Sequence, residues 1–415
     1  MASSQSRLSP RRRLLFSAFL LAAIAGLQEI AFRWMFPLPE LPTFNRIDYS
    51  PLIWFERTDG AGQHGLSNVK FRWESEPDGF AFDHTLNLYG FRGPDFRTEL
   101  PRDRPRVVFV GDSFVEGCGV SDDDTIPMQF ARIVGDHQPV EAINLGVKGT
   151  GFAEYWRIVR DGVYLLHPRT VFLVVCWNDL PTPFFSGPDP ESIPEFPRLN
   201  PFVPRIVQLL TRLGRGLVVP RRYVSGPLPY VQPVPALSNP ITQLIRPPEN
   251  VDPAILQAMG EGKLNPWLLG MNDRCEKMSS FDPAKTGGAT RYFQIMASHC
   301  RRQRTELVLV YVPLHVMTNS AYITAQNRLG GHQFSPDTMQ FARALYRRQL
   351  AHLVEVSRDL DIPFFDTTGD FARAEQSEGR MFWPVDGHCN AAGYHLIAQI
   401  CARYWLSRVG ATHPQ

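Results

Sequence analysis

The sequence lacks the features that mark several large classes of protein. Its 415 residues carry a net charge of only +2, so the chain has no excess of cationic residues for binding nucleic acid. The six cysteines form no CxxC pair and the 11 histidines form no HExxH motif, which argues against a zinc site. No internal repeat is evident, and no motif requires a metal or a cofactor.

Long hydrophobic runs are also scarce, apart from one near the N-terminus. Residues 14–27 are apolar and uncharged over 14 positions, and the apolar character continues past three polar residues to Phe36. Arg11 to Arg13 precede the run, and such basic residues hold the N-terminus of a membrane helix in the cytoplasm. The pattern predicts a basic cytoplasmic tail over residues 1–13 and a transmembrane signal anchor over residues 14–36.

The same run also suits a signal peptide that is removed after export. An uncharged stretch of 14 residues is short for a membrane span, and Ala23-Ile24-Ala25 offers small residues for cleavage. Both alternatives stay open, although Trp34 favours the anchor because tryptophan is common at membrane interfaces. Either way, the rest of the chain is expected outside the inner membrane, in a bacterial periplasm.

The rest of the chain has an ordinary globular composition, 44% hydrophobic and 20% charged, which suits a domain with a good core. Apolar runs rich in β-branched residues alternate with helical patterns. Buried strands are predicted at residues 106–110, 139–143, 171–176, 307–312 and 362–366. This alternation predicts a parallel sheet in a three-layer α/β/α domain of flavodoxin-like type, spanning residues 105–180 and 285–410. Pro363 places the last strand at an edge.

Polar residues follow three of these strands. Gly111-Asp112-Ser113 follows the first strand, the glycine-rich stretch 146–151 follows the second, and Asn178-Asp179 follows the third. Open α/β sheets bind their ligands at the carboxyl ends of the strands, so these residues are expected to lie near one site. Close to the C-terminus, Asp386-Gly387-His388 precedes a helix for which Asn390 is a good N-cap.

These side chains supply the groups that acyl transfer requires. Ser113 is the candidate nucleophile. His388 is the candidate base, because it alone among the histidines follows an Asp at close range before a helix N-cap. Asp386 would orient it, since residues i and i+2 of an extended segment point the same way. Taken singly, Ser113 can also be a plain turn residue, as can Asn178.

The order Ser, Gly, Asn, then Asp and His resembles the SGNH/GDSL hydrolase superfamily. Gly111-Asp112-Ser113 is similar to its first block, Gly149 to the second, Asn178 to the third and His388 to the fifth. The resemblance covers roughly residues 85–405, with one interruption.

The resemblance implies an oxyanion hole made of the backbone N–H groups of Ser113 and Gly149 and the side-chain amide of Asn178. Gly146 competes with Gly149, but Gly149 matches the family's spacing from Asn144. The spacing of Asp and His in this chain departs from the commoner D-x-x-H and resembles the D-x-H of alginate O-acetylation proteins.

A serine ester hydrolase or an O-acyltransferase is therefore implied, acting on an exported glycan, through its acetyl groups, or on a small ester. The alternatives are a lipase-like or thioesterase activity and, from another class, a catalytically silent glycan-binding or assembly subunit. Hydrolase and transferase are not distinguished by the sequence, and neither is the oligomeric state.

Two stretches lie outside the predicted sheet domain. Residues 37–104 are rich in Pro, Gly and aromatic residues, and we predict a lead-in with short strands. Residues 181–284 are predicted to be an insertion that caps the active site, because they leave the sheet directly after Asn178. Of the 36 prolines, 16 fall between residues 181 and 250, which prevents long helices or central strands there.

Three side-chain questions remain open at this stage. Cys118 and Cys389 flank the serine and histidine blocks, and Cys275 and Cys300 form a second candidate pair. Outside the cytoplasm each pair can be a disulfide or two free thiols, and free buried thiols are favoured for the first pair. Arg92 either has a structural role or pairs with a core carboxylate.

Overall fold

The computed structural model describes residues 9–35, 69–87, 89–97, 101, 103–180, 190–192, 203–207, 249–265, 268–279, 288–335 and 339–410. The described residues form two compact units. The first unit draws on Met1–Thr43 and Glu195–Pro220, and the second draws on Phe44–Pro194 and Arg221–Gln415. Each unit is described by itself below.

The first unit contains the long helix α1 (Pro10–Met35). Its 22 residues from Leu14 to Met35 are apolar and long enough to cross a membrane, as either an anchor or a signal sequence. Near its C-terminal end, the Glu29 carboxylate pairs with Arg33 at 2.6 Å. Both Glu29 oxygens also accept the backbone N–H of Arg205 at 2.9 Å, so residues 203–207 lie against this end of the helix.

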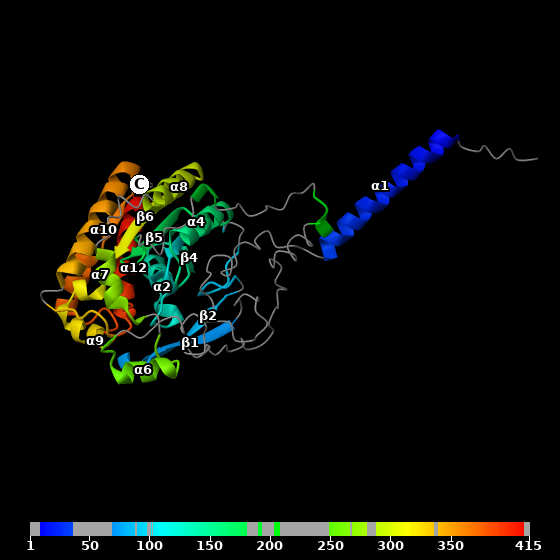
Figure 1. The fold of residues 1–415 in the computed structure, drawn as a ribbon. Helices are drawn as coiled ribbons and strands as arrows, with labels where there is room; N and C mark the ends of the chain where they lie inside the picture. Colours follow the sequence, from blue (N-terminus) through cyan, green and yellow to red (C-terminus); the bar gives the residue numbers. More distant parts are fainter. Residues whose placement is uncertain are drawn as a thin grey trace, which may run out of the picture. The chain divides into compact units, whose positions relative to one another are not determined.

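The second unit is built on a parallel sheet, as the sequence predicts (Figure 1). Among the described residues, five strands follow the order β4-β3-β5-β6-β7. Their bounds are β3 (Arg106–Gly111), β4 (Glu141–Gly146), β5 (Thr170–Cys176), β6 (Glu306–Val312) and β7 (Phe364–Asp366). β7 lies at an edge, as Pro363 indicated. β4 begins two residues later than predicted, because Pro139 has no N–H to donate to a neighbouring strand.

Helices cover both faces of the sheet and complete the three layers. The main helices are α3 (Ile126–Gly135), α4 (Phe152–Leu166), α8 (Gly288–Arg302), α10 (Met339–Leu360), α11 (Thr368–Ser377) and α12 (Ala391–Gly410). On one face, Phe130 of α3 packs on Phe109 of β3 and against Trp405 of α12. On the other, α4 packs on α8, and Gln349 of α10 accepts a hydrogen bond from the Tyr311 hydroxyl of β6 at 2.7 Å.

Shorter elements connect this framework. They are α2 (Ser113–Glu116), η4 (Asp122–Asp124), η5 (Pro190–Ser192), α6 (Pro253–Gly260), α7 (Met271–Ser279), η9 (His315–Met317), η10 (Ser320–Tyr322) and α9 (Ile323–Asn327). α6 and α7 fall inside the stretch predicted as an insertion, most of which lies outside the described residues. Ile255 and Met259 of α6 pack with Leu264, Leu329 and Val385, so this end of the stretch folds onto the sheet domain.

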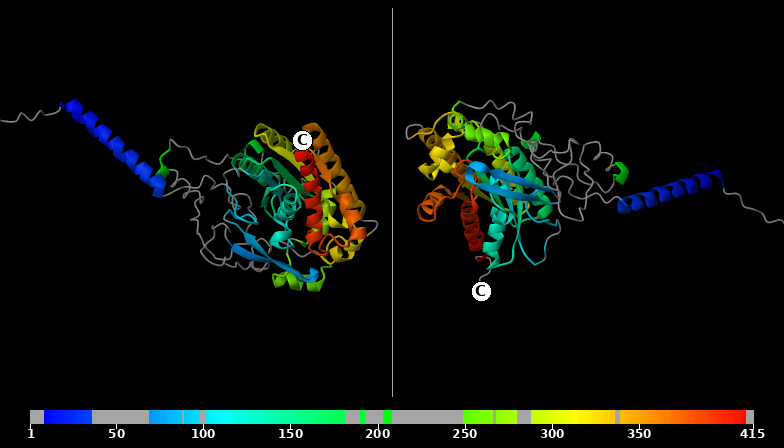
Figure 2. Two further views of the ribbon diagram at one scale, coloured as in Figure 1. Left: turned by 180° about the vertical axis from the view of Figure 1, so that it is seen from behind. Right: turned by 90° about the horizontal axis from the view of Figure 1, so that it is seen from below.

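The lead-in contains an antiparallel hairpin that is separate from the main sheet (Figure 2). β1 (Val69–Ser75) and β2 (Phe80–Leu86) pair over seven residues each and are joined through η3 (Glu76–Asp78). Gly79 follows η3 with a φ of +74°, a left-handed conformation that glycine adopts at little cost. This hairpin is one of the elements that contact the candidate site.

The described residues include all six cysteines and Arg92, whose roles the sequence left undecided. All six cysteines are buried and free, so neither candidate pair forms a disulfide. Arg92 is buried and has a structural role. It pairs with Asp122 at 2.7 Å and donates to the carbonyl groups of Gly117 and Val120, which binds the lead-in to the segment after the serine block.

Candidate active site

The serine block is a tight turn between β3 and α2. Val107 to Val110 are fully buried, so the strand is fixed in the core on both faces. Asp112 caps α2 by accepting the backbone N–H of Phe114 at 2.9 Å. Ser113 is therefore the first helical residue, at the carboxyl end of a central strand.

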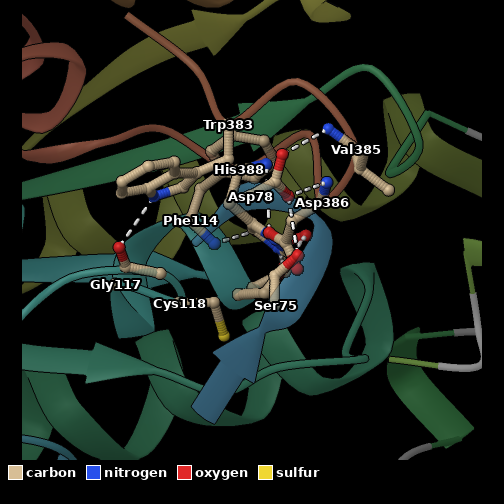
Figure 3. A network of polar contacts seen from close by, with 12 residues as sticks. Ser75, Asp78, Phe114, Gly117, Cys118, Trp383, Val385, Asp386 and His388 are labelled. Carbon is tan, nitrogen blue, oxygen red and sulfur yellow. Dashed lines mark hydrogen bonds and ion pairs between the residues drawn. The ribbon is translucent and has the colours of Figure 1, made fainter. Parts of the chain in front are cut away.

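Ser113, His388 and Asp386 form a continuous hydrogen-bonded chain. Ser113 Oγ lies 2.7 Å from His388 Nε2, and His388 Nδ1 lies 2.5 Å from Asp386 Oδ1. His388 and Asp386 are buried, with exposed fractions of 8% and 2%. Figure 3 shows the two side chains next to each other. A carboxylate only accepts, so the Nδ1–H of His388 donates to Asp386 and leaves Nε2 free to accept the serine proton.

The path from Asp386 to His388 differs from the extended segment that we expected. Gly387 has a φ of +79°, and its N–H donates to the carbonyl of Trp383 at 2.9 Å. The chain therefore turns between the aspartate and the histidine. The side chains meet because Asp386 Oδ1 faces back over the turn, where it also lies 3.3 Å from the backbone N of His388.

The surroundings of His388 favour its charged form. Burial by itself lowers the pKa of the imidazole, but the charge and hydrogen bond of Asp386 outweigh that effect, with help from Asp112 and Glu116. The pKa of His388 is consequently raised above its ordinary value. Aromatic rings enclose the imidazole, with the Phe114 ring centroid at 5.0 Å and that of Trp73 at 6.2 Å.

The three candidate oxyanion donors follow three adjacent strands, because β3 lies between β4 and β5. The N–H of Ser113 belongs to the first turn of α2 and has no partner inside the helix. Gly149 is exposed and has a φ of +70°, and the neighbouring Lys148 N–H donates to Glu116 Oε2 at 2.8 Å. This bond ties the Gly149 loop to the helix that begins at Ser113.

Gly146 has a different function from Gly149. It is the last residue of β4, and a Cβ built on it would lie 2.2 Å from the backbone N of Glu116. Real atoms do not approach so closely, so only glycine lets β4 pack against α2. We therefore interpret Gly146 as a packing residue, which leaves Gly149 as the glycine candidate for the oxyanion hole.

The side chain of Asn178 is oriented by a neighbour that the sequence did not point to. Its Oδ1 lies 2.8 Å from the sulfur of Cys176, the last residue of β5. The single thiol proton can be donated to this oxygen or to a carboxylate oxygen of Asp112 or Asp179. In each case the amide oxygen faces Cys176 and the NH₂ group is directed away from it. An NH₂ group is what a side-chain oxyanion donor has to present.

A cluster of buried acidic groups lies behind the serine turn. Cys176 Sγ is 3.0 Å from Asp112 Oδ2, and Asp179 accepts hydrogen bonds from the Cys176 N–H and the Tyr155 hydroxyl at 2.8 Å. Burial, together with the charge of Asp112, raises the pKa of Asp179 well above its usual range, which favours the protonated form of this carboxyl. The cluster joins the ends of β3 and β5.

This cluster is also the group of side chains that comes nearest to a metal site in the described part of the chain. The ligand atoms of Asp112, Cys176 and Asp179 lie within 4.8 Å of one another. Asp112 and Asp179 already accept hydrogen bonds from the backbone N–H groups of Phe114 and Cys176, and burial raises the pKa of the Cys176 thiol well above its usual value. Metal ligands must be deprotonated, and burial disfavours the deprotonated forms of both Cys176 and Asp179, so we assign the cluster a structural role.

Sequence reasoning did not find two residues that contact the triad. Trp73 lies edge-on to His388, and Asp78 binds the backbone of the segment that carries Asp386. Both belong to the lead-in hairpin. The spacing of Ser75 and Asp78 signals a local turn, but nothing in it connects that turn to residues 300 positions further along the chain.

Comparison with known proteins found similar solved structures at low sequence identity. No family model and no curated protein matches the chain. Similar solved structures include TesA (11% identity, TM-score 0.34, covering 72% of this chain and 97% of that one). A lipolytic protein of the G-D-S-L family from Desulfitobacterium hafniense matches at 10% identity and TM-score 0.34, covering 72% of this chain and 99% of that one.

A two-domain esterase active on acetylated mannans is also similar, at 12% identity and a TM-score of 0.35. The match covers 75% of this chain and 51% of that protein. At this level of similarity, the functional conclusion below rests on the site itself.

Proposed function

We propose that the protein is an SGNH-type serine hydrolase or O-acyltransferase that acts on ester bonds through Ser113, His388 and Asp386. The observation that carries the proposal is the chain of hydrogen bonds from Ser113 Oγ to His388 Nε2 at 2.7 Å and from His388 Nδ1 to Asp386 Oδ1 at 2.5 Å. A serine that was only a turn residue would not require a buried base and a buried acid in line with its hydroxyl.

In the proposed first step, Ser113 Oγ attacks the carbonyl carbon of the ester while His388 Nε2 takes the hydroxyl proton. The resulting imidazolium is stabilised by Asp386, which is already hydrogen-bonded to Nδ1. The proton then passes to the alkoxide that leaves, and an acyl group remains on Ser113. The raised pKa of His388 suits a base that accepts a proton and returns it within one cycle.

Negative charge develops on the carbonyl oxygen during this attack. The proposed donors to it are the N–H groups of Ser113 and Gly149 and the NH₂ group of Asn178. Support comes from their positions after three adjacent strands and from the amide of Asn178, whose oxygen is held by Cys176. Such pre-oriented donors stabilise the transition state more than the ground state.

In the second step an acceptor hydroxyl attacks the acyl-enzyme, with His388 as its base. Water gives hydrolysis, and a sugar hydroxyl gives transfer to a glycan. We propose an acetyl or similarly small acyl group and an exported glycan or small ester as substrate. We further propose that α1 holds the protein at the inner membrane with the catalytic unit in the periplasm, because three arginines precede its apolar stretch.

The proposed chemistry is tested by labelling the detergent-solubilised full chain with a serine-directed phosphonate. We expect one phosphonate per chain, attached to Ser113, and protection from labelling by activated acetyl, butyryl or longer esters according to which of them acylates the enzyme. The Ser113→Ala variant is the matched control. A fully folded chain that takes up no label would support the silent glycan-binding alternative instead.

Membrane location is tested separately. A reporter active only outside the cytoplasm and fused after Gln415 should be active, and the protein should stay with membranes through an alkaline carbonate wash. Release in soluble form, with a new N-terminus near Gly26, would instead identify the apolar run that begins at Leu14 as part of a cleaved signal.

A further inference from the structure

The lead-in hairpin binds the backbone of the segment that carries the catalytic acid. Asp78, the last residue of η3, accepts the N–H of Val385 through Oδ1 and the N–H of Asp386 through Oδ2, each at 2.8 Å (Figure 3). The hydroxyl of Ser75 donates to the same Oδ2 at 2.7 Å and holds the Asp78 carboxylate in place. One carboxylate therefore spans two consecutive N–H groups, the second of which belongs to Asp386 itself.

The turn that carries Asp78 is itself held from a second direction. The N–H of Glu76 donates to the carbonyl of Lys263 at 3.0 Å, and the Lys263 ammonium pairs with the Glu76 carboxylate at 3.0 Å. The segment around Lys263 also belongs to the apolar cluster that buries Val385. We call residues 384–387 the acid loop. The hairpin binds this loop through hydrogen bonds to Asp78, and the α6 segment packs against it at Val385.

The position of Asp78 disfavours its charged form, which a purely structural acceptor would not require. Burial and the nearby charge of Asp386 both raise the pKa of Asp78, so its charged form is disfavoured where it lies. A neutral acceptor would bind a backbone N–H without placing a second carboxylate beside the first. The same hairpin also places Trp73 edge-on to His388, with the two ring planes at 89°. The hairpin therefore contacts both the acid and the base.

We propose that Asp78 is a positioning residue for catalysis, which aims the Asp386 carboxylate at His388 by fixing two consecutive N–H groups of the acid loop. The inference rests on the proposed function, because it concerns the orienting member of that triad. The acid loop is the tip of a turn. An isolated antiparallel bridge between Phe382 and Cys389 closes the base of this turn, where the Trp383 N–H also donates to the His388 carbonyl at 2.8 Å. At the tip, the N–H groups of Val385 and Asp386 donate to Asp78, and a displacement of about 1 Å at a catalytic group can cost about 100-fold in rate.

The test compares four single variants of the detergent-solubilised full chain. Asp78→Asn keeps the shape but sets an NH₂ group against one of the two N–H groups, and Asp78→Ala removes both acceptors. Ser75→Ala removes only the hydroxyl that holds the carboxylate. Asp83→Asn is the matched control, since Asp83 lies on the same hairpin with its side chain 49% exposed and only an ion pair to Arg72 at 3.5 Å.

Activity is expressed per active site, with sites counted by phosphonate labelling. We expect kcat to fall about 100-fold in Asp78→Asn, at least as far in Asp78→Ala, and less in Ser75→Ala, with KM nearly unchanged. Asp83→Asn should match the unaltered protein. The pH profile of kcat/KM supplies a second readout. A displaced Asp386 stabilises the His388 imidazolium less, so the pKa of His388 falls and the acid limb, the rise of kcat/KM with pH, moves to lower pH.

His388 is the group that this profile reports. Asp386 faces it from its own loop, Asp112 and Glu116 face it from the serine turn, and His315 lies behind the acid loop. Burial lowers the pKa of His315 to about 4, so His315 is neutral above pH 5 and does not contribute to a limb near neutrality. A shift of the acid limb in Asp78→Asn therefore points to the contact between Asp386 and His388.

Two outcomes overturn the inference. One is an unchanged kcat per labelled site in Asp78→Asn, with activity lost only in proportion to labelled sites, because that pattern describes a role in folding. The other is a pH profile whose acid limb does not shift in either Asp78→Asn or Ser75→Ala. Ser75→Ala keeps the Asp78 carboxylate, so it tests the inference even if the Asp78 variants do not fold. Failure of the proposed function is recognised separately, by full activity in Ser113→Ala.

Discussion

The two halves of the site are held in different ways. The serine turn continues directly from β3, a fully buried central strand, and its cap and hydrogen bonds are local. The acid loop with His388 precedes α12 and does not continue from a strand of the main sheet, although an isolated bridge between Phe382 and Cys389 closes its base. It is fixed by Asp78 from the hairpin and by the apolar cluster around Val385. The nucleophile is thus positioned by the sheet, and the base and acid are positioned by segments added outside the sheet.

This difference predicts how each half responds to change. Substitutions near the serine turn act on the chemistry directly or on the packing of the sheet. Substitutions in the hairpin act at a distance, through the orientation of Asp386. The expected effects below run from the largest to the smallest.

Loss of the nucleophile or the base should have the largest effect. In Ser113→Ala and in His388→Ala, ester turnover should fall to near background, by about 10⁶-fold in each case, because members of a triad act as a unit. Steady-state assays with an activated acetyl ester measure the loss, and thermal unfolding verifies that the variants fold. If Ser113 were only a turn residue, its replacement would leave activity intact and cost about 1 kcal/mol of stability.

Replacement of the acid should cost less and should also move the pH profile. Asp386→Asn keeps the imidazole but removes the carboxylate that supports its charged form, so kcat should fall by about 10⁴-fold. His388 must be neutral to act as a base, so kcat/KM rises with pH through its pKa. The carboxylate raises that pKa, and its loss should move the acid limb to lower pH. An unmoved limb with full activity would assign the orienting role to another carboxylate.

Removal of the proposed side-chain oxyanion donor should be milder still. Asn178→Ala should lower kcat by about 10²–10³-fold, or roughly 3–4 kcal/mol, with little change in KM. Asn178→Asp is a useful companion, because it keeps the size and replaces a donor with a negative charge. A rise in KM with kcat preserved would show that Asn178 binds substrate without stabilising the transition state.

The smallest effects on catalysis should separate the two glycines. Gly146→Ala forces a Cβ against the backbone of Glu116, so it should lower the free energy of unfolding by about 1–3 kcal/mol. Gly149→Ala introduces the strain of a positive φ, about 1–2 kcal/mol, and retains its N–H. Thermal unfolding and kcat per labelled site distinguish them. A stable Gly146→Ala variant would contradict the packing role.

The sequence by itself determined the sheet and the serine half of the site. Apolar β-branched runs such as Val107 to Val110 predict buried parallel strands, and the turn residues at their ends predict where Ser113 and Asn178 lie. These inferences succeed because strand, turn and cap are encoded within a few consecutive residues. The short helices α6 and α7 escaped prediction, since they lie in and after a proline-rich stretch and owe their packing to distant residues such as Leu329.

Only the tertiary structure decided how the acid reaches the base. The spacing of Asp386 and His388 suggested an extended segment, whereas the chain turns at Gly387 and the Asp386 N–H donates to Asp78, 308 residues earlier. The orientation of the Asn178 amide likewise depends on the Cys176 thiol at the end of β5. A contact between segments so far apart leaves no periodicity or spacing in the sequence, because it depends on where the folded core brings their backbones together.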